Sequence, residues 1–134
     1  MLGPISPFFI VDDVPEAVRF YTEQLGFDVR FSIPEKDPFF AIVGRDLVQI
    51  FLKAIADTVG PQPNHTRHEW APWDASVHVD DPDALAAEFA AQGVTFHQPP
   101  GERDDGLRGF EVRDRDGYVL FFGHPQRDPG SKGA

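Results

Sequence analysis

Three side chains that can do chemistry alternate along one stretch of the chain, at Asp74, Ser76 and His78. These are the residue types of a hydrolytic triad, but positions i, i+2 and i+4 of a strand spread over about 13 Å, which is too far for a proton relay. Alternate residues of a strand share a face, so these three side chains lie opposite the apolar Ala75, Val77 and Val79 and could line a cleft. In such a cleft His78 could act alone as a general base. We expect a structural or ligand-contacting His78 rather than a catalytic one.

A second polar group, His65, His68 and Glu69, has a spacing that suggests metal binding at first sight. It lies in a proline-rich stretch without a helix that would hold both imidazoles on one face. Surface loop histidines are the better interpretation. The chain contains no cysteine, which excludes disulfides, thiolate metal sites and a cysteine nucleophile.

The net charge of the chain is −10 at pH 7. Such a field repels nucleic acid and anionic lipid and favours cationic partners, although an acidic surface can also serve solubility alone. The sequence has 13 Phe but only 2 Tyr, which suggests an aromatic core, an aromatic cleft or both. No targeting segment or membrane-spanning apolar run is visible, so we expect a cytoplasmic protein without membrane or nucleic-acid partners.

Two matching series of elements must position these residues. Apolar patterns predict strands over residues 5–11, 27–33, 39–43 and 47–53, and again over 74–79, 94–97, 107–113 and 118–122. A helix follows the first strand of each series, with Asp13 and Asp81 as N-caps and Gly26 and Gly93 as stops. The motif Val-Asp-Asp precedes both helices, at residues 11–13 and 79–81.

This repeat predicts one α+β domain made of two βαβββ modules, at about 4–53 and 74–124. A proline-rich connection over 54–73 joins the modules, and a polar tail over 125–134 is predicted to be mobile. Each module leaves one sheet face uncovered, so pairing the modules buries these faces or curls the sheets around a cleft.

Two motifs carry a resemblance to a known family. They are D-x-P-E-A-V-R-F-Y-T-E-Q-L-G-F over residues 13–27 and R-D-R-D-G-Y-V-L-F-F over residues 113–122. Together with the repeat they resemble the vicinal oxygen chelate superfamily, which includes glyoxalases, extradiol dioxygenases, fosfomycin-resistance enzymes and bleomycin-resistance proteins. The stretch G-F-E-V-R-D-R-D-G-Y-V-L-F-F looks most like the bleomycin-resistance branch.

The resemblance implies two βαβββ repeats in a curved mixed sheet around a cleft. It also implies a homodimer with clefts at or near the subunit boundary, and leaves open whether the first strands are exchanged.

Enzymes of this superfamily usually bind one divalent metal through His and Glu side chains on the first and last strands of each module. Aligned by the repeat, the four positions fall at Ser6, Gln49, Asp74 and Phe121. A divalent ion needs at least three good donors, and only Asp74 is one. No residue from 118 to 122 carries a carboxylate or an imidazole, so no shift of the alignment restores the fourth ligand. The sequence therefore predicts that the usual metal site is absent.

The strand faces predict an apolar pocket with a few polar groups, as small-molecule sites usually have, although the Phe residues could instead fill a closed core. Trp70 and Trp73 favour a site, because tryptophan stacks on planar or cationic groups. We predict no catalytic residue and ten ligand-binding residues: Phe8, Phe39, Gln49, Phe51, Trp70, Trp73, Asp74, Ser76, His78 and Phe121.

The first functional hypothesis is a metal-free and cofactor-free binding protein that sequesters a cationic or aromatic small molecule, with bleomycin-type antibiotics as the obvious candidates. The second is a lyase or dioxygenase of the same superfamily with an atypical divalent metal site. The third is a metal-independent enzyme with His78 as its base.

Overall fold

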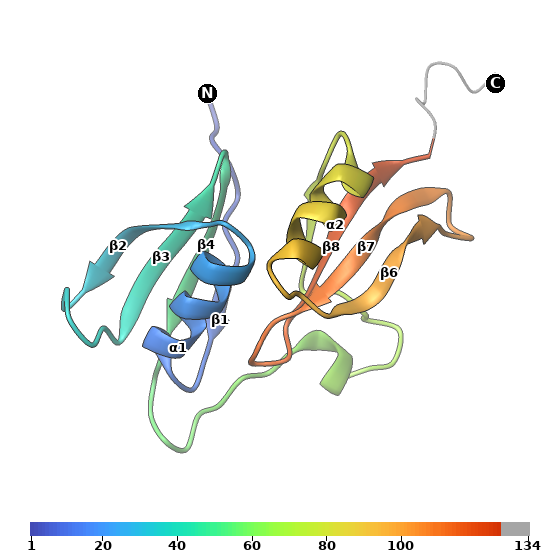
Figure 1. Ribbon diagram of the computed structural model, residues 1–134. Helices are drawn as coiled ribbons and strands as arrows, with labels where there is room; N and C mark the ends of the chain where they lie inside the picture. The colour runs from blue at the N-terminus through green and yellow to red at the C-terminus, as the bar shows by residue number, and fades with distance from the viewer. Residues whose placement is uncertain (127–134) are drawn as a thin grey trace.

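The computed structural model describes residues 1–126 as two four-stranded sheets, each covered on one face by a helix (Figure 1). The first module contains β1 (Phe8–Ile10), α1 (Val14–Arg19), the π-helical turn η1 (Phe20–Gln24), β2 (Asp28–Ile33), β3 (Phe40–Arg45) and β4 (Val48–Lys53). The second contains β5 (Ala75–His78), α2 (Pro82–Ala91), β6 (Phe96–Glu102), β7 (Leu107–Arg113) and β8 (Val119–Pro125), and the connection holds a short 3-10 helix, η2 (Asn64–Thr66). The predicted mobile tail falls almost wholly outside the described residues.

Both sheets have the same topology, which confirms the predicted pair of βαβββ units. The strand orders are β1-β4-β3-β2 and β5-β8-β7-β6. In each sheet the first strand runs parallel to the last, and the other neighbours are antiparallel. The two sheets remain separate and neither closes into a barrel. Within the described part of the chain, no helix is long and apolar enough to cross a membrane.

Both helices begin at the predicted caps. The carboxylate of Asp13 accepts the N–H of Glu16 at 3.0 Å, and that of Asp81 accepts the N–H of Ala84 at 3.1 Å. Gly26 follows the first helical segment with φ +73°, a conformation that favours glycine. The first segment differs from the prediction in one respect, since α1 ends at Arg19 and the chain continues as the π-helical η1.

The largest difference from the predicted strands lies in β6. The sequence predicts a strand over 94–97 and a loop over 98–106, whereas β6 continues to Glu102. Pro99 and Pro100 are tolerated because β6 is the sheet edge and its pairing with β7 is irregular between Phe96 and Gly101. The β6–β7 loop is therefore short, and Arg103 stands at its start beside the sheet.

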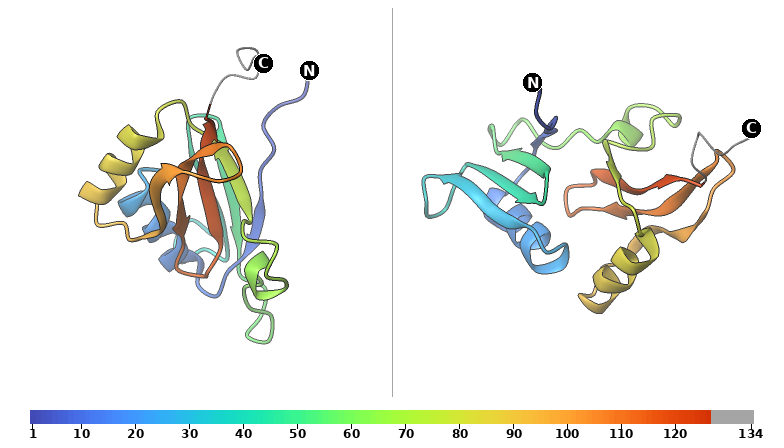
Figure 2. Two further views of the ribbon diagram at one scale, coloured as in Figure 1. Left: turned by 90° about the vertical axis from the view of Figure 1, so that its right-hand side faces the viewer. Right: turned by 90° about the horizontal axis from the view of Figure 1, so that it is seen from above.

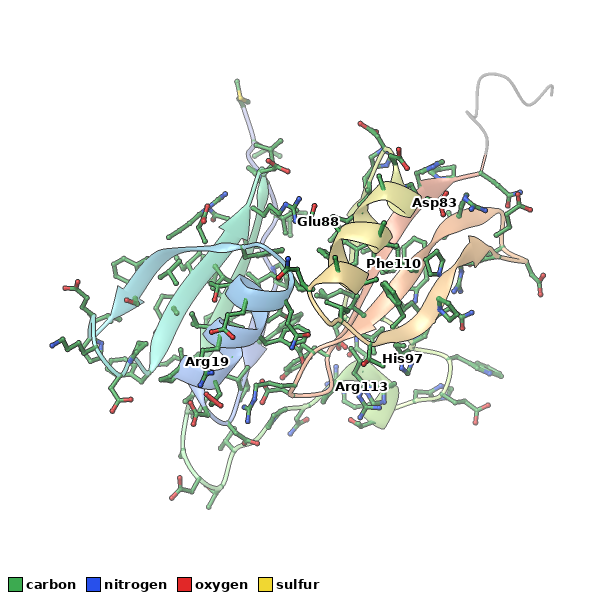
Figure 3. The ribbon with its side chains drawn as sticks, viewed as in Figure 1. Arg19, Asp83, Glu88, His97, Phe110 and Arg113 are labelled. Atoms are coloured by element: carbon green, nitrogen blue, oxygen red, sulfur yellow. The ribbon has the colours of Figure 1, made fainter. Side chains whose placement is uncertain are left out.

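The helix-covered faces of the two sheets share one buried core, and both helices lie on the same side of the molecule (Figure 2). Phe9 of β1 stacks on Tyr118, with ring centroids 4.1 Å apart and ring planes at 3°. The Tyr21 hydroxyl donates to Asp114 Oδ2 at 2.6 Å, also across the boundary between the two modules. Glu88 points from α2 toward the first module, where it pairs with Arg45 at 2.7 Å (Figure 3). These contacts join the modules through their helix-covered sides.

Candidate functional site

The candidate site comprises the two sheet faces that no helix covers, here called the first and the second open face. On the first, strand pairing places Phe8, Phe51, Ile42 and Phe31 side by side in one row. Phe40 stands beside this row, and the ring centroids of neighbouring Phe residues lie 5.7–6.3 Å apart. We call Phe8, Phe31, Phe40 and Phe51 the aromatic cluster. Phe8 is 56% and Phe31 48% exposed, so a large apolar surface faces outward.

Two members of the aromatic cluster, Phe31 and Phe40, were not among the predicted site residues. The strict alternation of residues 39–43 could have identified Phe40, because its neighbours Ala41 and Val43 are buried under α1. The predicted Phe39 lies just before β3, outside the aromatic cluster, and Lys53 Nζ stands 4.3 Å from its ring centre. Gln49 lies on the first open face with Phe51, as its place in β4 requires, and is half-buried.

The second open face has a row of residues in the place that corresponds to the row on the first open face, but with different side chains. Strand pairing aligns Ser76, Phe121, Glu111 and Gln98 in this row. Phe121 is only 2% and Glu111 only 7% exposed, although no helix covers them. Other side chains must therefore cover this part of the second open face.

The cover comes from Trp73 and Arg103. Trp73 stacks on Phe121, with ring centroids 4.4 Å apart and planes at 14°. The indole Nε1 donates to Glu111 Oε2 at 2.9 Å, and Arg103 Nη1 donates to the same oxygen at 2.9 Å. His97 Nε2 lies 3.9 Å from the other Glu111 oxygen. We call Trp73, Arg103, Glu111 and Phe121 the Trp73 cluster; the sequence indicated Trp73 and Phe121 but gave no sign of Arg103 or Glu111.

Asp74 positions Trp73 rather than facing a ligand freely. Its Oδ1 accepts the N–H of Asn64 at 2.8 Å, and its Oδ2 accepts the N–H of Val119 at 2.9 Å. The Asn64 amide donates in turn to the Trp73 carbonyl at 3.0 Å. The end of the connection is thereby fixed to β8, and both carboxylate oxygens of Asp74 have backbone partners.

The remaining predicted site residues lie at the surface. Ser76 and His78 are exposed on the second open face, and His78 Nε2 bonds Asp80 Oδ1 at 3.1 Å. Trp70 is 83% exposed and contacts the His68 ring, with centroids 5.4 Å apart, rather than Trp73. His65, expected as a surface histidine, is half-buried and bonds the Gly117 carbonyl at 2.8 Å.

The sheet pairing corrects one step of the repeat alignment. Phe51 pairs with Phe8, and Phe121 pairs with Ser76 in the matching place. The counterpart of Phe121 is therefore Phe51 and not Gln49. The sequence alignment was therefore off by two residues along β4, and a shift of two keeps the same strand face.

The donor set at these positions does not fit the divalent metal that the superfamily resemblance implies. Ser6 is a weak donor, Phe51 and Phe121 are none, and the oxygens of Asp74 already accept backbone N–H groups. Across residues 1–126, no three His, Asp or Glu side chains lie together in a metal-binding arrangement. The open faces instead offer aromatic rings and one buried carboxylate, which suit a planar or cationic organic group.

Comparisons with solved structures find the same fold in several proteins. TioX from Micromonospora sp. ML1 matches with a TM-score of 0.71 and 21% identity, over 92% of this chain and 99% of that chain. TnmS3, an antibiotic binding protein from Streptomyces sp. CB03234, matches with a TM-score of 0.68 and 22% identity, over 92% and 97%. At these identities the likeness concerns the fold alone.

A third structure is the bleomycin-binding protein from bleomycin-producing Streptomyces verticillus, complexed with copper(II)-bleomycin. It matches with a TM-score of 0.64 and 29% identity, over 91% of this chain and 94% of that chain. A comparison with curated protein sequences finds no significant match. The sequence profile described as Glyoxalase/Bleomycin resistance protein/Dioxygenase superfamily matches residues 3–122. The profile spans nearly the whole chain and confirms the resemblance, so the chain belongs to the glyoxalase/bleomycin resistance protein/dioxygenase superfamily.

Proposed function

We propose that this protein binds and sequesters a small molecule that combines a cationic group with an aromatic system, without a metal and without turnover. The observation that carries the proposal is the buried Phe121. This phenylalanine stands at one of the four positions to which the superfamily's metal ligands align, and it is stacked under Trp73 beside the carboxylate of Glu111. Aromatic faces and a buried carboxylate recognise organic cations, whereas a ring at a ligand position contributes nothing to a metal.

The two open faces support different parts of such a ligand. The aromatic cluster presents exposed rings to a planar system, and each stacked aromatic pair contributes about 0.5–1.5 kcal/mol beyond area burial. Glu111 supplies the negative charge on the second open face. The net charge of −10 attracts a cation over longer range and increases its association rate. Bleomycin-type antibiotics are the first candidates, since a relative at 29% identity is a bleomycin-binding protein.

The proposal includes a homodimer. The aromatic cluster exposes a contiguous apolar surface, which is unusual for a monomer and typical of an interface or ligand groove. Among the described residues, no aromatic contact joins the first open face to the second within one chain. A second copy that sets its second open face against the first open face would enclose a ligand between them. Light scattering across a concentration series measures the mass, and a chain that stays monomeric at high micromolar concentration contradicts this part.

Isothermal calorimetry with metal-free bleomycin and with copper(II)-bleomycin tests the binding function. We expect saturable binding that the Phe51→Ala variant weakens about tenfold, because one stacked aromatic face is lost. Leu47→Ala removes an exposed apolar side chain from the β3–β4 turn, outside the aromatic cluster, and should leave the affinity unchanged. Absence of binding at millimolar concentration would discard this ligand class.

Elemental analysis tests the metal-free part separately. After expression in metal-replete medium, we expect no stoichiometric metal and no gain in ligand affinity on adding Mn²⁺, Fe²⁺, Zn²⁺ or Ni²⁺. One ion per chain, retained through dialysis and required for binding, would instead support an atypical metal enzyme.

A further inference from the structure

Arg103 lies in an unusual environment for a loop arginine. Its guanidinium carbon is 5.1 Å from the Trp73 ring centre and 5.5 Å from that of Phe121. Nη1 donates to Glu111 Oε2 at 2.9 Å, and Nε donates to Asp105 Oδ2 at 3.1 Å. One cation thus lies beside two stacked rings and bonds two carboxylates, and only 26% of its side chain is exposed.

The residues around this guanidinium supply both kinds of group that bind an organic cation, aromatic rings and a carboxylate. Trp73 and Phe121 offer a stacked pair of rings, and Glu111 offers a carboxylate whose side chain is 9% exposed. A buried carboxylate without a cationic partner destabilises a fold strongly. The Glu111 carboxylate therefore requires a cation beside it whenever a ligand is absent. Arg103 satisfies that requirement from within the chain.

We propose that Trp73, Phe121 and Glu111 form a subsite for a planar cationic group, a guanidinium or an amidinium, and that Arg103 occupies this subsite as an internal competitor. A ligand that carries such a group displaces the Arg103 side chain and takes over its contact with Glu111. This inference rests on the proposed binding function and specifies the chemical class that the second open face takes.

The shape of the subsite selects a planar cation over an ammonium. A guanidinium or amidinium lies flat against a ring while its edge donates to a carboxylate, whereas an ammonium is a compact, strongly hydrated point charge. The indole Nε1 already donates to Glu111 Oε2, which leaves room at that oxygen for one further in-plane donor. Arg103 now fills this place.

The displaced arginine has an alternative position next to its present one. A hollow of about 390 Å³ adjoins the β6–β7 loop and is lined by Gln98, Glu102, Arg103, Asp104 and Asp105. Its three carboxylates include Asp105, which already bonds Arg103 Nε, so the guanidinium can leave the subsite without losing all of its charge partners. The movement is confined to one side chain and a short loop.

The fluorescence of Trp73 reports occupancy of the subsite. Trp70→Phe removes the only other tryptophan, which is exposed and contacts the His68 ring. In this background, titration with benzamidine should quench or shift the emission of Trp73, whereas benzamide, its neutral analogue, should have little effect. Arg103→Ala should tighten benzamidine binding about tenfold, the gain expected if Arg103 leaves the subsite free about one tenth of the time.

Arg108→Ala is the matched control, because it removes the same charge from β7, the strand that follows the Arg103 loop. There Arg108 pairs with Asp83. This variant should leave the affinity for benzamidine within twofold of the parent protein. Glu111→Gln keeps an acceptor for the indole and should abolish the preference for benzamidine over benzamide. Arg103→Lys keeps the charge and should give an intermediate affinity.

A thermal-shift series keeps the inference testable if Arg103→Ala unfolds easily. Benzamidine should then raise the midpoint of Arg103→Ala more than that of the parent, since a ligand of the native state stabilises in proportion to its occupancy. Unchanged or weaker binding by Arg103→Ala, an equal gain in Arg108→Ala, or no discrimination between benzamidine and benzamide would each overturn the inference. Calorimetry of the unmodified protein with bleomycin judges the proposed function independently of these results.

Discussion

Phe51 on β4 and Phe121 on β8 hold matching places in two sheets of identical strand order, yet Phe51 is partly exposed whereas Phe121 is 2% exposed. The difference begins in the adjacent row of each open face. Ile10, Lys53 and Phe40 form this row in the first sheet, and His78, Gly123 and Gly109 form it in the second. Where the first sheet has a phenylalanine, the second has a glycine.

The glycines allow the Phe121 ring to lie flat on its sheet. A Cβ built at Gly109 would stand 2.7 Å from the Phe121 Cζ atom, and one at Gly123 would stand 2.6 Å from the same atom. With the ring flat, Trp73 can stack on it and Glu111 can receive the indole and the arginine. One repeated backbone thus supports an open aromatic face and a closed, charged one, and the row beside the phenylalanine determines which of them forms.

Replacing the two phenylalanines separately should give the largest contrast. Phe121→Ala should lower the free energy of unfolding by about 4 kcal/mol, because it leaves a cavity under Trp73. Phe51→Ala should lower it by about 1 kcal/mol, since that ring is partly exposed and leaves no enclosed cavity. Urea denaturation at low protein concentration measures both. Equal losses would contradict the distinction between an open and a closed face.

The sequence predicted the backbone better than the surfaces. Alternating strands, the caps Asp13 and Asp81 and the Val-Asp-Asp repeat are local signals, and each of them led to the correct module order. Proline misled the prediction at β6, because a sequence does not show that a strand lies at a sheet edge, where Pro99 and Pro100 are tolerated.

The candidate site was less accessible to sequence analysis. Trp73 and Phe121 are large aromatic residues that stand out in a sequence. The contact between Arg103 and Glu111, however, joins a loop to a neighbouring strand, and no local sequence pattern indicates it. Asp74 looked like a free acid because its two backbone partners, Asn64 and Val119, are brought to it by the tertiary fold. Roles that depend on which strand lies beside which could not be derived from spacing alone.

The glycine row provides a second test of the comparison. Gly109→Ala should destabilise the protein by about 3 kcal/mol, because the new methyl group would overlap the Phe122 carbonyl and the ring of Phe121. Gly101→Ala, on the neighbouring strand of the same row, meets no atom within 4 Å and should change stability by less than about 0.5 kcal/mol. Chemical denaturation of both variants measures the difference, and similar losses would show that the row is not what closes the second open face.

The boundary between the modules should respond to pH through Asp114. Burial raises the pKa of Asp114 from 3.8 to about 6, although hydrogen bonds from the Tyr21 hydroxyl and the Tyr118 and Asp116 backbone lower it in part. The folded protein therefore binds a proton that the unfolded chain has already released between about pH 4 and 6. The stability from this group is fully present below about pH 4 and is lost as the pH rises through about 6.

Asp114→Asn isolates this effect, because the amide does not titrate and its oxygen can still accept the backbone N–H groups. The free energy of unfolding of the parent minus that of the variant should fall by about 2–3 kcal/mol between pH 4 and 7. Denaturation of both proteins at several pH values measures this difference and cancels groups that titrate alike in each. A difference that rises with pH would mean that the charged carboxylate stabilises the boundary, with the Tyr21 hydrogen bond outweighing the effect of burial.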